Sequence, residues 1–218
     1  MITFENLIDG FTKLGLCKDD TVMVHSSFKS FGGVSGGPNT VINALIEILG
    51  KDGNLVMPTY TLNFCREFNE RGFGYFDVDN TPSELMGILP ETLRKMPNSY
   101  RTINPMHSVV AHGKLAKYLT ETGDKNSYSK KSVFGKLHDL NAKLMIIGLT
   151  FQQSLTFFHY VEQMIPVTFR SFKKFSGVIV NNGKKYTIIL LLCIIYDSII
   201  ITYQMCFVNT SFHRRIPP

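Results

Sequence analysis

The chain has 218 residues, of which 44% are apolar and 18% charged, a composition typical of a globular protein rather than a disordered or collagen-like one. Its 23 basic and 17 acidic residues give a formal net charge of +6, which favours anionic partners such as nucleic acid or a phosphate-bearing cofactor. The basic residues are scattered and form no run of five or more, so we expect no nucleic-acid binding.

Cysteine spacing and hydropathy exclude further classes. The four cysteines form no Cys-x-x-Cys pair, which argues against a zinc ribbon or a thioredoxin-type site, and reduced thiols are expected. The first 20 residues alternate apolar and charged side chains, so no secretory signal is predicted. The longest apolar run, Ile188–Tyr196, has nine residues, against roughly 20 for a bilayer span. The sequence predicts a cytoplasmic protein without membrane association.

The first quarter of the chain has the pattern of a βαβ unit. An amphipathic helix is predicted over residues 4–14 and ends at Gly15. After it we predict a strand over Thr21–His25, a Gly- and Ser-rich loop to Asn39, a helix over Thr40–Leu49 and a strand over Asn54–Pro58. Two strands joined through a helix predict a parallel sheet in an α/β fold.

The middle of the chain is less regular. Residues 60–80 lack periodicity and are predicted to form one long loop, a feature that is often functional in compact domains. The elements predicted after it are a helix over Pro82–Met96, a strand over Ser108–Ala111, a helix over Lys114–Thr122, a buried strand over Lys143–Leu149 and a helix over Ser154–Gln163. In open α/β sheets the site lies at the carboxyl ends of the strands, where His25, His107 and His159 are expected.

The composition changes abruptly near the C-terminus. Residues 188–218 contain three charged residues, and they show no helical or strand periodicity. A buried C-terminal strand and out-of-frame translation are both consistent with this composition. We therefore divide the chain into residues 1–187 and an atypical tail of residues 188–218.

One group of candidate residues lies in the Gly-rich loop. His25 ends the predicted strand, and Ser26 and Ser27 open the loop that contains four glycines. Backbone N–H groups at such a strand end can hold phosphate or thioester oxygens, and Lys29 can add a positive charge. A tight turn that needs glycine for conformational reasons alone is the alternative.

The other candidates are histidines and carboxylates. His107 lies at a loop–strand junction, where it could act as a general base or be an ordinary core histidine. His159 and Glu162 are three residues apart on a predicted helix, a spacing that suits a base and its orienting carboxylate, two metal ligands, or an unremarkable helix-face pair. Asp77 and Asp79 could attract a cationic substrate or form a solvated turn.

Six segments in order carry a resemblance that covers roughly residues 3–187. They are VHSSFKSFGGVSGG, TVINALIEILGKDGNLVMPTYT, FDVDNTPSELMGILPETLR, RTINPMHSVVAHG, SVFGKL and LMIIGLTFQQSLTFFHYVE. Their order and gaps resemble those of the aminoglycoside N3-acetyltransferase family, whose acetyl-CoA-dependent enzymes modify antibiotics. The resemblance implies an α-β-α sandwich with a mixed, largely parallel sheet.

The resemblance also implies an activity and a site. The implied reaction transfers an acetyl group from acetyl-CoA to the 3-amino group of an aminoglycoside-type antibiotic, which is a cationic small molecule. This reaction would confer antibiotic resistance, and no metal ion is expected to take part in it. The residues that it implies are His159, Glu162 and His107 for catalysis, His25, Ser26, Ser27, Lys29, Ser108, Val133 and Phe134 for acetyl-CoA, and Asp77 and Asp79 for the amine. An acetyltransferase for a different amine is an alternative.

Three departures from the family pattern raise another alternative. Asn104 and Met106 stand where the family often has His and Thr, and Val133 replaces a usual Pro. The acidic stretch that the family has near the C-terminus is replaced by IILLLCIIYDS, in which Asp197 is the one carboxylate. The chain therefore resembles a truncated or frameshifted member, and a catalytically inactive CoA-binding protein is the alternative function.

Overall fold

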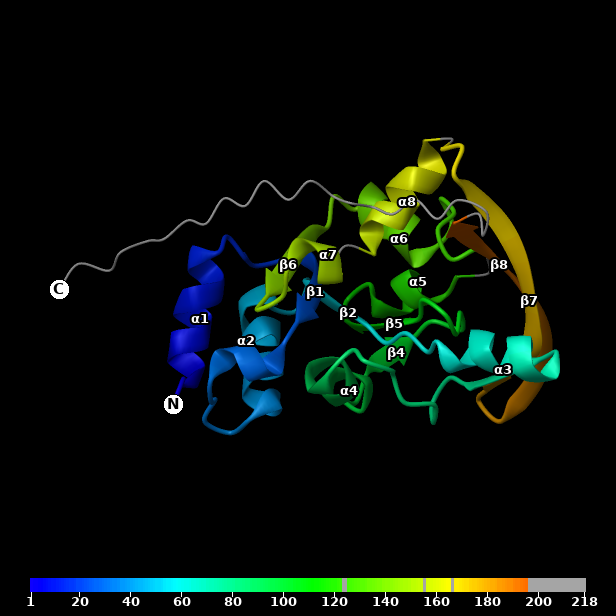
Figure 1. The fold of residues 1–218 in the computed structure, drawn as a ribbon. Coiled ribbons are helices and arrows are strands. Elements are labelled where there is room, and N and C mark those ends of the chain that lie inside the picture. The colour runs from blue at the N-terminus through cyan, green and yellow to red at the C-terminus, as the bar shows by residue number, and fades with distance from the viewer. Residues whose placement is uncertain (123–124, 155, 166, 196–218) are drawn as a thin grey trace.

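A five-stranded mixed sheet forms the centre of the molecule (Figure 1). The computed structural model describes residues 1–122, 125–154, 156–165 and 167–195. The strand order is β4 (Ser99–Arg101), β5 (Val109–Gly113), β2 (Asn54–Pro58), β1 (Thr21–Ser26) and β6 (Lys143–Ile147). The strands β2, β1 and β6 are parallel, whereas β5 and β4 are antiparallel to their neighbours. The predicted parallel βαβ unit is therefore confirmed.

Helices cover both faces of this sheet, because successive strand residues point to opposite sides. Val22 and Val24 face the helices α1 (Phe4–Lys13), α2 (Pro38–Leu49) and α4 (Ile88–Arg94). Met23 and Val56 face the helices α5 (Ala116–Thr120), α6 (Val133–Asp139) and α8 (Phe157–Met164). These three layers confirm the predicted α-β-α sandwich.

A second, three-stranded sheet was not predicted. It has the order β3 (Gly74–Asp77), β7 (Arg170–Asn181) and β8 (Lys184–Ile195), and it packs against the helix α3 (Asn63–Arg71). Figure 1 shows the long β7–β8 hairpin at the end of the molecule opposite α1. Its core contains the buried side chains of Phe64, Phe76, Val78, Met106, Phe175, Ile179 and Leu190.

The long loop predicted over residues 60–80 is wrong, because the structure has α3 and β3 there. Within α3 the apolar residues Phe64 and Phe68 have the four-residue spacing of one helix face, but most of the segment is polar, as in a loop. The ring of Phe68 lies 5.2 Å from that of Phe175 on β7, about 100 residues later. Contacts distant in sequence therefore stabilise this helix.

The helix predicted over Pro82–Met96 is too long. The helix α4 begins at Ile88, after Gly87 with its positive φ of 84°. This start places Pro90 in the first turn, where no backbone N–H is needed, whereas an earlier start would place it inside the helix.

Other boundaries differ as well. The strand predicted to be buried at Lys143–Leu149 is the edge strand β6, in which Lys143 and Leu144 are exposed. The structure has α8 from Phe157, and α7 (Phe151–Ser154) precedes it, where one helix from Ser154 was predicted. The strand β4, the helix α6 and the strand β7 had no predicted counterpart.

The first part of the atypical tail is a strand. Residues 188–195 continue β8, and each pairs with β7, from Ile188 opposite Gly177 to Ile195 opposite Arg170. The pairing of β8 with β7 continues across residue 187. The division of the chain into residues 1–187 and 188–218 stays a prediction. Asp197 and the rest of the tail lie outside the described residues. None of the described helices is long and apolar enough to cross a bilayer.

A buried arginine joins the two sheets. Arg101 on β4 donates from Nη2 to the Thr59 carbonyl at 2.6 Å and from Nη1 to the Thr81 carbonyl at 2.5 Å. Its guanidinium also lies 4.8 Å from the ring centre of Phe76 on β3. Burial, assisted by the nearby charge of Arg94, lowers the pKa of Arg101 to about 10, so it remains charged at neutral pH.

We predict that Arg101→Met lowers the free energy of unfolding by about 3 kcal/mol, because buried carbonyls lose their donor. Urea denaturation at pH 7 measures this loss. Arg66→Met is the control, since the Arg66 side chain is 62% exposed and its ion pair with Glu84 spans 3.8 Å. We expect a loss below about 1 kcal/mol for it. Equal losses in the two variants would contradict the role of Arg101.

Candidate functional site

The carboxyl ends of β1 and β6 are held together at one edge of the main sheet, by which we mean the edge formed by the ends of the strands and not an edge strand. The Ser27 N–H donates to the Ile147 carbonyl at 2.9 Å, so the loop after β1 adjoins the end of β6. A side chain at Gly148 would overlap the Ser30 hydroxyl, and glycine is therefore required at this close approach. The edge is the one at which α/β sheets bind ligands.

The Gly-rich loop leaves this edge and leads into α2. It contains the 3-10 helix η1 (Phe28–Phe31), and Gly36 and Gly37 have left-handed φ angles of 78° and 70° just before α2. Gly37 caps α2 without a side-chain hydrogen bond. Lys29 is exposed, and no ion pair involving it occurs in the described part of the chain. Backbone N–H groups and this ammonium suit an anionic ligand.

His25 and Ser26 bring unpaired polar atoms to the same edge. His25 is buried, and burial lowers its pKa to about 4, so its imidazole is neutral at physiological pH. Neither His25 Nε2 nor Ser26 Oγ has a hydrogen-bond partner among the described residues. Buried polar atoms in proteins are normally paired, and a polar ligand at this edge could supply the partner.

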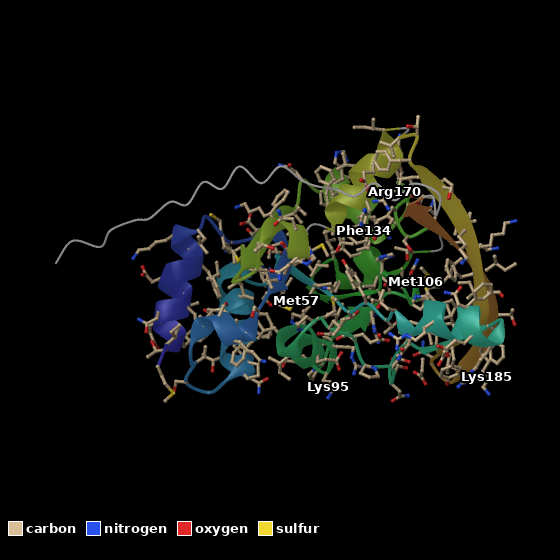
Figure 2. All side chains as sticks on the ribbon, in the orientation of Figure 1. Met57, Lys95, Met106, Phe134, Arg170 and Lys185 are labelled. Atoms are coloured by element: carbon tan, nitrogen blue, oxygen red, sulfur yellow. The ribbon has the colours of Figure 1, made fainter. Side chains whose placement is uncertain are left out.

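A three-residue polar cluster lies at α8. Glu162 Oε2 lies 2.9 Å from His159 Nδ1 and accepts from Arg170 Nη2 at 2.7 Å. Arg170 Nη2 is also 3.0 Å from His159 Nδ1. Figure 2 shows Arg170 at the end of β7 that lies beside α8. The His159 side chain is 39% exposed, against 16% for Glu162 and 12% for Arg170, so the imidazole is the accessible member.

Aromatic rings connect this cluster to His107. The Tyr128 ring centre is 4.7 Å from that of His107 and 5.4 Å from that of His159. On its other side, the His107 ring lies 5.3 Å from Tyr60, which follows β2. Burial, with a smaller contribution from the charge of His159, lowers the pKa of His107 to about 3. His107 is therefore a neutral imidazole at physiological pH, and a weak base.

The remaining predicted cofactor residues lie in the protein interior. Ser108 is fully buried, and its hydroxyl lies within hydrogen-bond distance of the Thr59 carbonyl and of Arg101 Nε. Val133 and Phe134 are buried on α6, and the Phe134 ring lies 5.1 Å from that of Tyr128. Phe134 therefore supports the wall on which His107 and His159 pack.

The two aspartates lie elsewhere. The Asp77 carboxylate accepts hydrogen bonds from the backbone N–H groups of Asp79 and Asn80, as predicted for a turn. Burial would raise the pKa of Asp77, but these bonds and the charge of Arg101 lower it overall. Asp79 lines a cavity of about 560 Å³ with Tyr100, Arg101, Lys117 and Glu121. In the described part of the chain, no hydrogen bond or ion pair links either aspartate to His159 or Glu162.

Sequence reasoning missed Arg170, Tyr128 and Tyr60. Arg170 is on a strand and eight residues beyond Glu162, so no helical spacing connects the two. The Arg170 contact argues against His159 and Glu162 as two metal ligands, because the guanidinium already donates a hydrogen bond to the carboxylate oxygen.

Comparison with known proteins gives a consistent family. The family model described as aminoglycoside 3-N-acetyltransferase matches residues 23–201. A Bacillus subtilis (strain 168) protein, SPbeta prophage-derived aminoglycoside N(3')-acetyltransferase-like protein YokD, is 31% identical over 180 residues, which cover 75% of this chain and 66% of that protein. Aminoglycoside N(3)-acetyltransferase III of Pseudomonas aeruginosa is 26% identical over 209 residues, which cover 84% and 72%.

A solved structure shares the fold. The binary complex of AAC-IIIb with CoASH superposes with a TM-score of 0.77 at 24% identity, over 87% of this chain and 75% of that one. The chain thus spans about two thirds to three quarters of the length of these proteins. Because the family model matches well over half of the residues, and the fold agrees, the chain belongs to the aminoglycoside 3-N-acetyltransferase family of acyltransferases.

Proposed function

We propose that the chain transfers an acetyl group from acetyl-CoA to the 3-amino group of an aminoglycoside-type antibiotic, and so confers resistance to it. The observation that carries the proposal is the pairing of an accessible imidazole, His159, with the carboxylate of Glu162 at 2.9 Å. An amine must lose a proton to become an amide, and a carboxylate-oriented imidazole is suited to accept it near neutral pH.

Acetyl-CoA is the proposed co-substrate, and the residues at the sheet edge fit it. The unpaired atoms of His25 and Ser26 and the exposed ammonium of Lys29 can pair with the polar and anionic parts of CoA. Ser27 lies in the same loop, and the glycines after it allow the backbone to approach the ligand closely. Ser108, Val133 and Phe134 are buried, and Phe134 packs on Tyr128 beside His107 and His159, so these three residues would contribute to the shape of the site and not by direct polar contacts.

The proposed reaction is a direct transfer. The neutral amine attacks the thioester carbon, a C–N bond forms, and the C–S bond breaks. His159 Nε2 takes the proton of the amine, and the imidazolium then protonates the departing thiolate, so that CoA leaves as a thiol. Backbone N–H groups of the loop would stabilise the oxyanion. His107, too weak a base for this step, packs against Tyr128 and thereby helps to order His159.

The amine itself requires acidic partners, because aminoglycosides are polycationic. Asp77 and Asp79 remain the candidates named from the sequence, and Asp79 faces a cavity large enough for a sugar ring. The sequence around Asp197 departs from the resembled pattern, which keeps a catalytically inactive CoA-binding protein as the second candidate. A different amine substrate is a further outcome of the assays below, and a cytoplasmic location stays a prediction.

We predict that His159→Gln lowers kcat by a factor of about 10² to 10⁴, because the general base is lost. Thiol release from acetyl-CoA with a panel of aminoglycosides measures the rate, and the CoA-induced rise in Tm should stay as in the unchanged protein. His138→Gln is the control, since His138 lies 64% exposed on α6 and pairs with the exposed Asp139. Its rate should be unchanged.

Thiol release distinguishes the candidate functions. A folded protein that gains Tm with CoA but releases no thiol with any amine would establish the inactive binder and contradict the acetyltransferase. Release with other primary amines, and none with aminoglycosides, would change the proposed substrate.

We predict that Lys29→Gln weakens CoA binding about fivefold, corresponding to ~1 kcal/mol for one exposed charge pair. Isothermal titration with CoA at low salt measures the Kd. Lys185→Gln is the control, because Lys185 is exposed at the tip of the β7–β8 hairpin (Figure 2), whereas the Gly-rich loop bonds to Ile2 beside α1 at the other end of the molecule. Equal affinities of the two variants would remove Lys29 from the cofactor site.

A further inference from the structure

The charges around His159 balance within one small cluster. Glu162 contributes one negative charge and Arg170 one positive charge, and their closest atoms are 2.7 Å apart. Both side chains are mostly buried, so water screens them weakly. His159 Nδ1 lies 2.9 Å from the carboxylate and 3.0 Å from the guanidinium. A proton on the imidazole is thus attracted by one neighbour and repelled by the other.

These two neighbours also favour different tautomers of the imidazole. A carboxylate only accepts, and so favours a proton on Nδ1, whereas a guanidinium only donates, and so favours a bare Nδ1. The Arg170–Glu162 contact is the shortest of the three and joins two full charges. With Arg170 committed to Glu162, Nδ1 can donate to the same carboxylate oxygen, which leaves the lone pair on Nε2.

The other groups that face His159 do not upset this balance. Tyr128 and His107 approach from the segments before α6 and β5, and His107 is uncharged at neutral pH. From its own helix His159 faces Glu162, and from β7 it faces Arg170. Without Arg170, the carboxylate would act alone and would favour the imidazolium, which cannot accept a proton from an amine.

We propose that Arg170 is a positioning residue for the His159–Glu162 pair: its guanidinium holds the Glu162 carboxylate at Nδ1 and offsets its charge, so that Nδ1 donates to the carboxylate and the lone pair on Nε2 faces away from both. The proposal rests on the proposed function for its catalytic meaning. The protonation state of His159 itself is a property of the free protein and can be measured without any substrate.

The first test is an NMR titration of the imidazole in the free protein, with the His159 signals assigned by their absence in His159→Gln. We expect Arg170→Gln to move the titration midpoint of His159 upward by about 1 pH unit, since a nearby positive charge is lost. Glu162→Gln should move it downward, because the guanidinium then acts alone. Arg170→Lys keeps the charge and should give a smaller shift than Arg170→Gln.

A matched control separates charge from general destabilisation. Arg94 forms a similarly buried ion pair with Glu91, with side chains 9% and 17% exposed and atoms 2.8 Å apart. Arg94→Gln should therefore destabilise the protein comparably and leave the His159 midpoint unchanged. An unchanged midpoint in folded Arg170→Gln, or equal shifts in both variants, would overturn the proposal.

The second test needs no variant at position 170. Nitrogen-15 shifts of the neutral imidazole in the unchanged protein report its tautomer, and we expect the proton on Nδ1. A proton on Nε2 would show that Nδ1 accepts from Arg170 and does not donate to the carboxylate, and it would overturn the proposal even where Arg170→Gln fails to fold.

Kinetics give the catalytic consequence. For Arg170→Gln we expect kcat/KM at pH 7 to fall about threefold, as a 1-unit upward shift of an imidazole predicts, and to recover above pH 8.5, whereas a merely structural role predicts the same loss at every pH. The same amine serves for all variants, so its own titration is common to every profile. If neither the variants nor the unchanged protein release thiol, the proposed function fails, while the NMR result stands.

Discussion

The guanidinium of Arg101 is the interaction on which the arrangement of the two sheets depends. It comes from an edge strand of the main sheet and donates to carbonyls after β2 and after β3, where the backbone has left its strands. A carbonyl in such a buried position must find a donor, and one planar side chain supplies several in a fixed geometry. The turn that holds Asp77 and the segment that ends in Ser108 are both fixed relative to this cation.

The β7–β8 hairpin contacts both the helix α3 of the second sheet and the cluster around His159. Near its middle, Phe175 packs on Phe68 of α3, while its first residue, Arg170, contacts Glu162 on α8. Lys185 marks the opposite end of the same hairpin (Figure 2). Because Arg170 pairs with Ile195 in the ladder, the first residues of the atypical tail also hold the cluster around His159 in register.

Two histidines show how environment assigns roles to identical side chains. His107 and His159 both pack on Tyr128, yet burial makes His107 a weak base, while His159 is partly exposed and has a carboxylate at its Nδ1. The general base of the proposed reaction is therefore assigned by burial and charge rather than by residue type. Asp77 and Asp79, named from the sequence as amine-binding candidates or turn residues, lie apart from this pair: Asp77 accepts backbone hydrogen bonds in a turn, and Asp79 lines a separate cavity.

The sequence alone determined the elements with strong local patterns and the family. Apolar periodicity predicted α1 and α2, short apolar runs predicted β1 and β2, and collinear motifs predicted the α-β-α fold. The contact between His159 and Glu162 was predicted from spacing, because residues three apart on a helix lie on the same face. Only the tertiary structure decided α3, β7 and the contacts of Arg101 and Arg170. Those features depend on partners far along the chain, which the local sequence of a segment does not identify. They also depend on burial, which sets whether a charge or an imidazole can act.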